Sequence, residues 1–310
     1  MRAPVAAAAT VWTPTDFPDE STWSVDLTAA DRDALVAAGR GDTTAADHFR
    51  EAAARWTTLL QQGAGFLRLR SFPIDELSPD EVERAYLALG TVLGTPVGQD
   101  RDANVLTHIR DERLPSDPSV RKYRTNQRQD FHSDGSDLVG LLCLHPALEG
   151  GESKIVSAHA VYNEALRRAP HLVDVMYQPM PWDRNDEQPD GEPPFFELPP
   201  IFDIDGTPRV FFIAWYIRDS QRHSAAPRLS ADQREALALF ESIANDPAFH
   251  IQMTFEPGDV QLLNNAVVLH SREQYTDHAD PDRRRHLLRL WLTAATAGTH
   301  ELLRQGIPRQ

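Results

Sequence analysis

Cysteine is almost absent from this sequence. The single cysteine, Cys143, lies within the apolar run LVGLLCL, so no disulfide can form inside the chain. Disulfides are typical of oxidising compartments. We therefore expect a protein of the reducing cytoplasm, with Cys143 as a small core residue. A structural zinc site, which usually needs several cysteines, is also disfavoured.

Long apolar runs and an excess of basic residues are missing too. No segment approaches the roughly 18 uncharged apolar residues of a membrane span, and the N-terminus, MRAPVAAAATVWT, is too weakly apolar for a signal peptide. Lys and Arg number 31 against 46 Asp and Glu, a formal net charge of −15. Such a surface repels phosphate backbones, so we expect neither a membrane nor a nucleic acid as partner. Whether the chain forms a homo-oligomer stays open.

The hydropathy pattern favours a β-rich core flanked by helices. A chain of 310 residues with 41% hydrophobic residues can bury a sizeable core. Helical periodicity and a capping-box sequence, SPDE, predict helices at 45–62, 78–93 and 230–244. Alternating or continuous apolar runs predict strands at 65–72, 138–144, 152–157, 209–215, 250–255, 259–265 and 285–294. This order indicates an antiparallel barrel or sandwich.

Two segments are expected to be exposed. Residues 110–130 are rich in charge and turn formers, and PWDRNDEQPDGEPP (181–194) is rich in proline and acidic residues. Both compositions are typical of surface loops.

A histidine and an aspartate precede the strand at 138–144. In FHSDGSD (131–137), side chains two apart in extended backbone point the same way, so His132 and Asp134 project together. The same residues are common in turns, and His-x-Asp alone is a weak signal of a metal. Further along, PGDVQLLNNAVVLHSR (257–272) predicts a hairpin whose second strand ends in His270. Two histidines and one carboxylate are the ligand set of non-haem Fe(II) oxygenases.

The last predicted strand, RHLLRLWL, places two arginines on one face. Alternation puts Arg285 and Arg289 with Leu287 and Trp291, opposite a leucine-rich face that must pack against an apolar layer. The guanidinium groups would then point into the barrel. A buried guanidinium is costly without an anion, and arginine binds carboxylates in a bidentate fork. We therefore expect one or two small-molecule carboxylates there; the alternative is that both arginines are solvated on an edge strand.

The order of these motifs resembles a known family. HSD, GGES (150–153), NN, His270 and RHLLRLW follow one another as in the taurine dioxygenase-like (TauD/TfdA) branch of the Fe(II)/2-oxoglutarate-dependent oxygenases, which includes clavaminate synthase-like enzymes. The resemblance implies a mostly β fold with flanking α: a double-stranded β-helix (jelly-roll, cupin-like) core, N-terminal helices and an insert before the last metal ligand. We expect one domain, 1–310, with its core at about 95–296 and the insert at about 170–250.

The resemblance also implies which residues hold the cofactors. His132, Asp134 and His270 match the iron ligands. Arg285 matches the arginine that binds the distal carboxylate of 2-oxoglutarate. Ser153 stands where a threonine hydroxyl contacts the same carboxylate, so the donor is kept and a methyl group is lost.

Substrate contacts are less well defined by the resemblance. Arg289 matches a position that binds the substrate's acidic group in some members and supports 2-oxoglutarate in others. Arg128 and Gln99 stand where the taurine enzyme has other residues, so taurine itself is not expected as the substrate. We treat both as candidate substrate contacts, with a solvated or structural role as the alternative.

The implied activity uses Fe(II), 2-oxoglutarate and O2, and it releases succinate and CO2. It removes hydrogen from an unactivated C–H bond of a small anionic, amino-acid-like metabolite, most simply to hydroxylate it. Desaturation and oxidative cyclisation begin with the same step and stay open. Asp134 argues against a halogenase, which needs a small residue there. Two other classes also stay open: a non-catalytic metal-binding jelly-roll protein and a zinc-dependent hydrolase.

Overall fold

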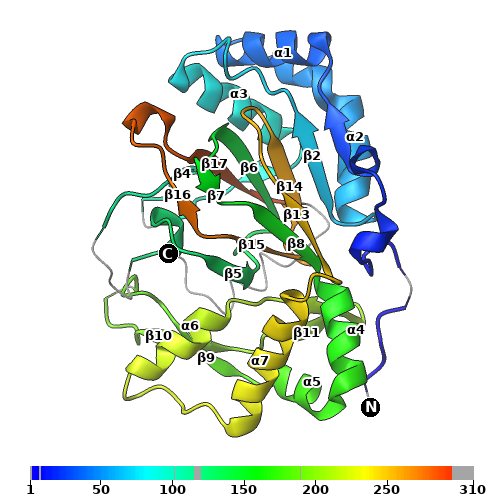
Figure 1. Ribbon diagram of the computed structural model, residues 1–310, viewed down its shortest axis with the longest axis vertical. Helices are drawn as coiled ribbons and strands as arrows, with labels where there is room; N and C mark the ends of the chain where they lie inside the picture. Colours follow the sequence, from blue (N-terminus) through cyan, green and yellow to red (C-terminus); the bar gives the residue numbers. More distant parts are fainter. Residues whose placement is uncertain (1, 7, 101, 115–119, 189, 295–310) are drawn as a thin grey trace.

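The computed structural model describes residues 2–6, 8–100, 102–114, 120–188 and 190–294. Two β-sheets lie face to face at its centre, and helices cover the outer side of each (Figure 1). This arrangement is the double-stranded β-helix that the sequence predicted. None of the helices in these ranges is long and apolar enough to cross a membrane.

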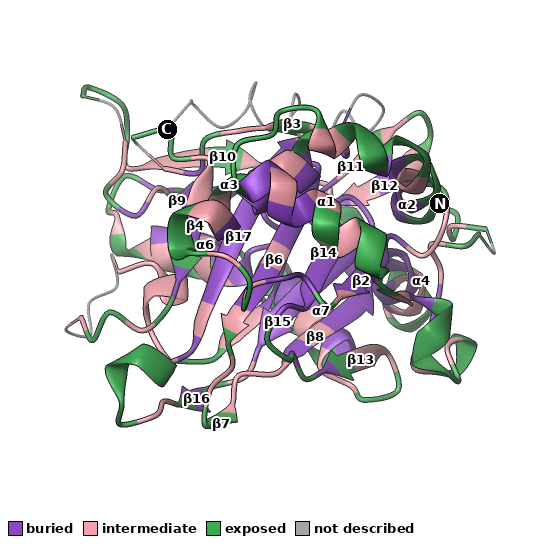
Figure 2. Ribbon diagram, turned by 90° about the horizontal axis from the view of Figure 1, so that it is seen from above, coloured by how far each residue is buried: buried purple, intermediate pink, exposed green. Residues whose placement is uncertain are grey.

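The larger sheet has the strand order β1–β2–β14–β6–β17–β3, and β4 also pairs with β17. All its pairs are antiparallel except β1 with β2. Figure 2 shows its central strands buried, with exposed residues on the helices outside them. The strands are β1 (Ser24–Asp26), β2 (Phe66–Arg70), β3 (Thr95–Pro96), β4 (Leu106–Ile109), β6 (Leu138–His145), β14 (Val260–Asn264) and β17 (His286–Thr293).

Three helices pack on the outer face of this sheet: α1 (Ala29–Gly39), α2 (Arg50–Gln61) and α3 (Pro79–Thr91). Helix α3 begins as predicted, with a reciprocal Ser78–Glu81 capping box. Leu288, Leu290 and Leu292 of β17 join this helical layer, whereas Leu287 belongs to the cluster between the sheets. The alternation read from the sequence of β17 is therefore confirmed.

The smaller sheet has the order β13–β8–β15–β5. Its outer face packs through Val156 and Leu269 against α4 (Ala158–Arg168), α5 (Pro170–Met176) and α7 (Ala231–Ala244). Its inner face contributes Ile155 and Val268 to the cluster between the sheets. The strands are β5 (Gln129–His132), β8 (Ser153–Ser157), β13 (His250–Met253) and β15 (Val268–Arg272).

The strand predicted at 209–215 is only partly present. Strand β12 (Thr207–Val210) pairs with β11 (Ile201–Ile204) and stops, and helix α6 (Ala214–Asp219) begins four residues later. The connecting residues include Phe211 and Phe212, which are buried beside the smaller sheet. An apolar run of this length is compatible with a buried helix or turn as well as with a strand.

The sequence predicted that the proline-rich segment 181–194 is exposed, but its first residues are buried. It begins inside β9 (Met180–Asp183), which pairs with β10 (Phe195–Leu198) and is buried throughout. Trp182 is fully buried, and its indole N–H donates to the carbonyl oxygen of Leu198 at 2.8 Å. One aromatic anchor thus holds the start of an otherwise polar excursion in the core.

A buried hydroxyl gives a prediction about stability. The hydroxyl of Tyr86 in α3 has no hydrogen-bond partner in the described structure, and a Cβ on Gly140 of β6 would lie 2.4 Å from it. We predict that Tyr86→Phe raises the free energy of unfolding by about 1 kcal/mol, because it removes an unsatisfied buried polar group. Urea unfolding measures this change. Tyr162→Phe is the matched control: its hydroxyl donates to the carbonyl oxygen of Ala3, so that variant should lose stability. A loss of stability in Tyr86→Phe would contradict the prediction.

Candidate metal and co-substrate site

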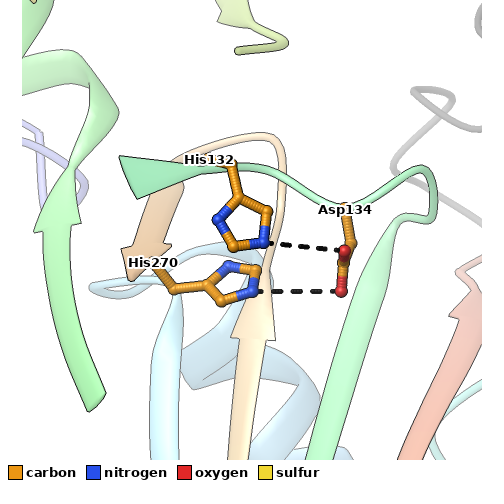
Figure 3. A group of neighbouring side chains, drawn as sticks. All are labelled: His132, Asp134 and His270. Carbon is orange, nitrogen blue, oxygen red and sulfur yellow. Dashed lines mark ion pairs between the residues drawn. The ribbon is translucent and has the colours of Figure 1, made fainter. Parts of the chain in front are cut away.

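Strand pairing brings the two predicted histidine ligands together. His132 in β5 is the cross-strand partner of His270 in β15, and their ring centroids are 4.2 Å apart. The carboxylate of Asp134 lies 3.9 Å from Nε2 of each imidazole (Figure 3). The candidate ligand atoms of all three lie within 4.8 Å of one another. In the described residues, no other group of three or more such side chains meets this condition.

The loop that contains Asp134 is held by the turn between β14 and β15. The side-chain oxygen of Asn265 accepts from the backbone N–H of Asp134 at 3.0 Å. Its amide nitrogen donates to the carbonyl oxygen of Ser136 at 3.0 Å, and its backbone N–H donates to the carbonyl oxygen of Asp137. One asparagine of the Asn-Asn turn therefore fixes Asp134 relative to β15, the strand that contains His270.

Burial and neighbouring charges together set the protonation states of the three side chains. Burial, together with the neighbouring His270, lowers the pKa of His132 to about 3. Burial also lowers the pKa of His270. Burial opposes ionisation of Asp134, but Arg289 and the two histidines together bring its pKa below the ordinary value. Two neutral imidazoles and one carboxylate are the state that a bound metal requires.

The donor set fits Fe(II). Nδ1 of His132 donates to the carbonyl oxygen of Asp130 at 2.8 Å, which leaves the Nε2 lone pair on the side of Asp134. That Nε2 lies 3.1 Å from the amide nitrogen of Gln129, a side chain at the cavity wall. Two imidazoles and one carboxylate, with no fourth protein ligand in the described group, leave open positions for small molecules.

A cavity extends from the two histidines toward Arg285. Its polar lining includes three arginines and a serine: Arg272, Arg285, Arg289 and Ser153. Its apolar walls include Ile109, Leu141, Phe255 and Leu287.

The GGES motif makes room for Arg285. Gly151 has φ +76°, and a Cβ there would lie 3.1 Å from Nε of Arg285 and 3.2 Å from Cβ of Tyr275. Gly150 has φ +77°, and its Cβ would lie 2.3 Å from a backbone oxygen. Arg285 is only 4% exposed, and its Nη1 has no hydrogen-bond partner in the described structure. Gly151 thus lets the chain pass close to a buried guanidinium that has N–H groups to spare, and Gly150 lets it pass close to the backbone of Gln274.

Ser153 lines the same cavity as Arg285. Its hydroxyl donates to Oε1 of Gln261 at 3.0 Å. In this arrangement the proton of Ser153 is directed at a protein partner.

Gln99 holds Arg289 and does not line the cavity. Nε of Arg289 donates to Oε1 of Gln99 at 2.7 Å, and the amide nitrogen of Gln99 donates to the carbonyl oxygens of Val105 and Arg289. The guanidinium lies between the rings of Tyr123 and Trp291, 5.1 and 4.7 Å from their centroids. Its Nη1 is 3.3 Å from Oδ1 of Asp134. Of the two roles considered for Gln99, the structural one matches its contacts.

Arg128 does not reach the site. Its side chain is exposed, its Nε lies 3.2 Å from Oδ1 of Asp130, and its Nη2 donates to Asn245 at the end of α7. It is not among the residues that line the cavity. These contacts do not support the predicted substrate contact, because the exposed guanidinium is held by Asp130 and Asn245.

Two residues at the site were missed in the sequence. Trp291 donates from its indole N–H to Oδ2 of Asp134 at 3.0 Å. Arg272 lines the cavity and is 6% exposed. It follows His270 by two residues, so the alternation rule applied to β17 would have placed it on the same face as that histidine.

Comparisons with known proteins agree with this geometry. Residues 27–291 match the taurine catabolism dioxygenase TauD, TfdA family. FR-33289 synthase from Streptomyces rubellomurinus is 36% identical over 242 residues, which are 75% of this chain and 70% of that protein. A taurine hydroxylase-like protein from Stachybotrys chartarum is 29% identical over 246 residues, 74% of this chain and 61% of that protein. The structure of asparagine oxygenase with Fe(II), 3-hydroxyasparagine and succinate has a TM-score of 0.67 at 17% identity, covering 87% of this chain and 94% of that one.

A double-stranded β-helix with this ligand group beside an arginine-lined cavity defines an Fe(II)/2-oxoglutarate-dependent dioxygenase. The chain belongs to the TauD/TfdA family of these enzymes, and it uses Fe(II), 2-oxoglutarate and O2.

Acidification should destabilise the metal-free protein. His132 is neutral when folded, with a pKa of about 3, whereas in the unfolded chain it binds a proton near its ordinary pKa of 6.5. Below pH 6.5 the unfolded state therefore binds more protons, and the free energy of unfolding falls by up to about 1.4 kcal/mol per pH unit for this group. Urea unfolding measured between about pH 7 and about pH 5 should show that the free energy of unfolding changes less with pH in His132→Gln than in the wild type. Equal slopes would contradict this prediction.

Adding a methyl group at Gly151 should disturb Arg285. We expect Gly151→Ala to lower the free energy of unfolding by about 1–3 kcal/mol and to weaken 2-oxoglutarate binding, because the new Cβ meets Arg285 and Tyr275. Gly206→Ala is the matched control: its φ is +74°, with nothing within 4 Å of the new Cβ. Both variants have backbone strain, and only Gly151→Ala also has the clash with Arg285. Urea unfolding and calorimetric titration with 2-oxoglutarate, carried out on both variants, therefore separate the two effects. Equal behaviour of the two variants would show that the contact with Arg285 is unimportant.

Proposed function

We propose that this dioxygenase hydroxylates a small, anionic, amino-acid-like metabolite, with His132, Asp134 and His270 as the ligands of Fe(II). The observation behind the proposal is the juxtaposition of that three-residue group with a cavity lined by buried arginines. Bound together, Fe(II), 2-oxoglutarate and O2 supply an oxidant that removes hydrogen from an unactivated C–H bond. The chain's own contribution is to position the reactants and exclude water.

Arg285 binds the distal carboxylate of 2-oxoglutarate in this proposal. Its Nη1 is buried without a partner in the described structure, so a carboxylate there would satisfy it and balance its charge. Burial lowers the pKa of Arg285, the direction expected for a cation that lacks a close anion. Ser153, on the neighbouring wall, would offer a hydroxyl if it turned from Gln261. The apolar walls at Phe255 and Leu287 keep water from the space between.

Arg289 is placed to bind the acidic group of the substrate. It lies beside Asp134, and its planar group is held between two aromatic rings and by Gln99, so little side-chain entropy is lost on binding. Trp215 of α6 packs against His132 with ring centroids 5.1 Å apart and limits the space over the metal ligands. Taurine and asparagine, named for two of the similar proteins, both combine an amino group with an acidic group on a short chain. These features support an amino-acid-like substrate.

Succinate release tests the proposal. Incubated aerobically with Fe(II), ascorbate and 2-oxoglutarate, the enzyme should form succinate slowly, and faster when a panel of amino acids and aminosulfonates includes the substrate. Asp134→Ala should lower succinate release by more than about 100-fold, because one of three metal ligands is lost. Arg128→Ala, outside the cavity, is the control that should keep wild-type activity.

The products distinguish the remaining outcomes. A product heavier by one oxygen atom indicates hydroxylation, and a product lighter by two hydrogen atoms indicates desaturation or cyclisation. Tight zinc binding without 2-oxoglutarate binding or succinate release would overturn the proposal.

A further inference from the structure

Arg272 supplies a second buried guanidinium in the cavity that Arg285 lines. The roles proposed for Arg285 and for the metal ligands do not explain why Arg272 is there. It ends β15, and Nε and Nη1 are buried with no hydrogen-bond partner in the described structure. Both arginines line the active-site cavity. An unsatisfied buried donor is costly, and more so when it is charged, so a native structure needs a reason to keep one.

The remaining nitrogen of Arg272 is fully used. Nη2 donates to the carbonyl oxygens of Thr125 at 2.9 Å and Lys122 at 3.3 Å, and also to that of Gln127. One edge of the guanidinium therefore fixes residues 122–127. That segment contains Tyr123, whose ring packs against Arg289 on the substrate side of the site.

The two guanidinium groups share one aromatic ring. Their centres lie 5.1 Å (Arg272) and 5.0 Å (Arg285) from the ring centroid of Tyr275. Burial and, to a smaller extent, the like charge of Arg285 together lower the pKa of Arg272 to about 9. None of the described residues that line the cavity is acidic. Two desolvated cations that pack on one aromatic ring are stabilised by an anion between them or beside them.

The donors left for such an anion are guanidinium N–H groups. The hydroxyl of Ser153 donates to Gln261, whereas Nη1 of Arg285 and Nε and Nη1 of Arg272 have no protein acceptor in the described structure. Arginine N–H groups pair with both oxygens of a carboxylate. The geometry thus favours a ligand carboxylate bound from two sides.

We propose that Arg272 is a second arginine for the distal carboxylate of 2-oxoglutarate, and that it links binding of the co-substrate to the position of residues 122–127. This inference rests on the proposed binding of 2-oxoglutarate at Arg285. Arg272 would then be a specificity residue. The 2-oxo acid 2-oxopentanoate has the same chain length but no distal carboxylate, so Arg272 would not strengthen its binding.

The test compares two ligands with two arginine variants. Binding of 2-oxoglutarate and of 2-oxopentanoate is measured by calorimetry, without oxygen, on the Fe(II)-loaded protein. Arg272→Lys should weaken 2-oxoglutarate binding by about 10- to 100-fold. A lysine ammonium can still donate to the carbonyl oxygens, but it lacks the second set of N–H groups that the guanidinium offers to the carboxylate. It should leave the weak binding of 2-oxopentanoate unchanged. Arg209→Lys is the matched control: Nε of Arg209 is also buried without a partner, but Arg209 does not line the cavity.

A purely structural role for Arg272 gives a different result. Arg272→Lys would then keep wild-type affinity for 2-oxoglutarate, or weaken both ligands equally, and either outcome overturns the inference. Failure of the wild type to bind 2-oxoglutarate would instead overturn the proposed function.

A measurement on the wild type covers the case in which the variant does not fold. Hydrogen exchange of the backbone amides in residues 122–127 should slow at least about 10-fold when 2-oxoglutarate binds, and should stay unchanged with 2-oxopentanoate. Equal protection by both ligands, or by neither, would rule out the link between Arg272 and this segment.

Discussion

An excess of buried positive charge is the constraint on which the site depends. Arg272, Arg285 and Arg289 line one cavity, and among the described residues the carboxylate that forms an ion pair with one of their guanidinium groups is that of Asp134, with Arg289. The divalent metal that we propose Asp134 and the two neutral imidazoles hold would add to this excess. Uncompensated charge is strongly unfavourable in a water-poor interior. The remaining negative charge must therefore come from small molecules, which is why a dianionic co-substrate and an acidic substrate suit this cavity better than neutral ones.

The period of two in a β-strand lets one segment serve both the core and the site. In β17, Leu288 and Leu290 pack under the helices while Arg289 points between the sheets. In β15, Leu269 joins the outer cluster while His270 and Arg272 face the cavity. A slip of one residue would exchange these faces and bury guanidinium groups among leucines. The apolar packing that stabilises each sheet thus also fixes which polar side chains meet the ligand.

The parts of the site that the sequence predicted are those that depend on local spacing. His132 and Asp134 are two residues apart, and the arginines of β17 follow an apolar alternation. Arg272 follows the same alternation relative to His270, so this rule could also have predicted it as a residue of the site. By contrast, a proline-rich or apolar composition could not show that Trp182 anchors 181–194 in the core, or that the run after Val210 turns into a helix.

Contacts between distant segments could not be read from spacing at all. Gln99 bonds Arg289 across 190 positions, and Asn265 bonds Asp134 across 131. Nothing near Gln99 in the chain shows that its amide is used up by backbone carbonyls. Arg128 was considered only because of its distance from His132 along the chain, and its guanidinium points to the end of α7 instead.

The two sides of the cavity differ in how firmly the fold holds them. The proposed metal ligands and Arg285 are in or next to strands of the two sheets. Tyr123, which lines the cavity, lies in a connecting segment, and Trp215, which packs against His132, lies in a short helix. Lys122 lies over the ring of Trp215 at 4.6 Å, so these two substrate-side elements contact each other directly. Rigid strands suit groups that must keep ångström-scale geometry, and connecting segments tolerate change. Beyond the acidic group that we propose binds Arg289, we therefore expect a change of substrate within this architecture to alter residues 122–127 or α6, while the groups on the strands stay in place.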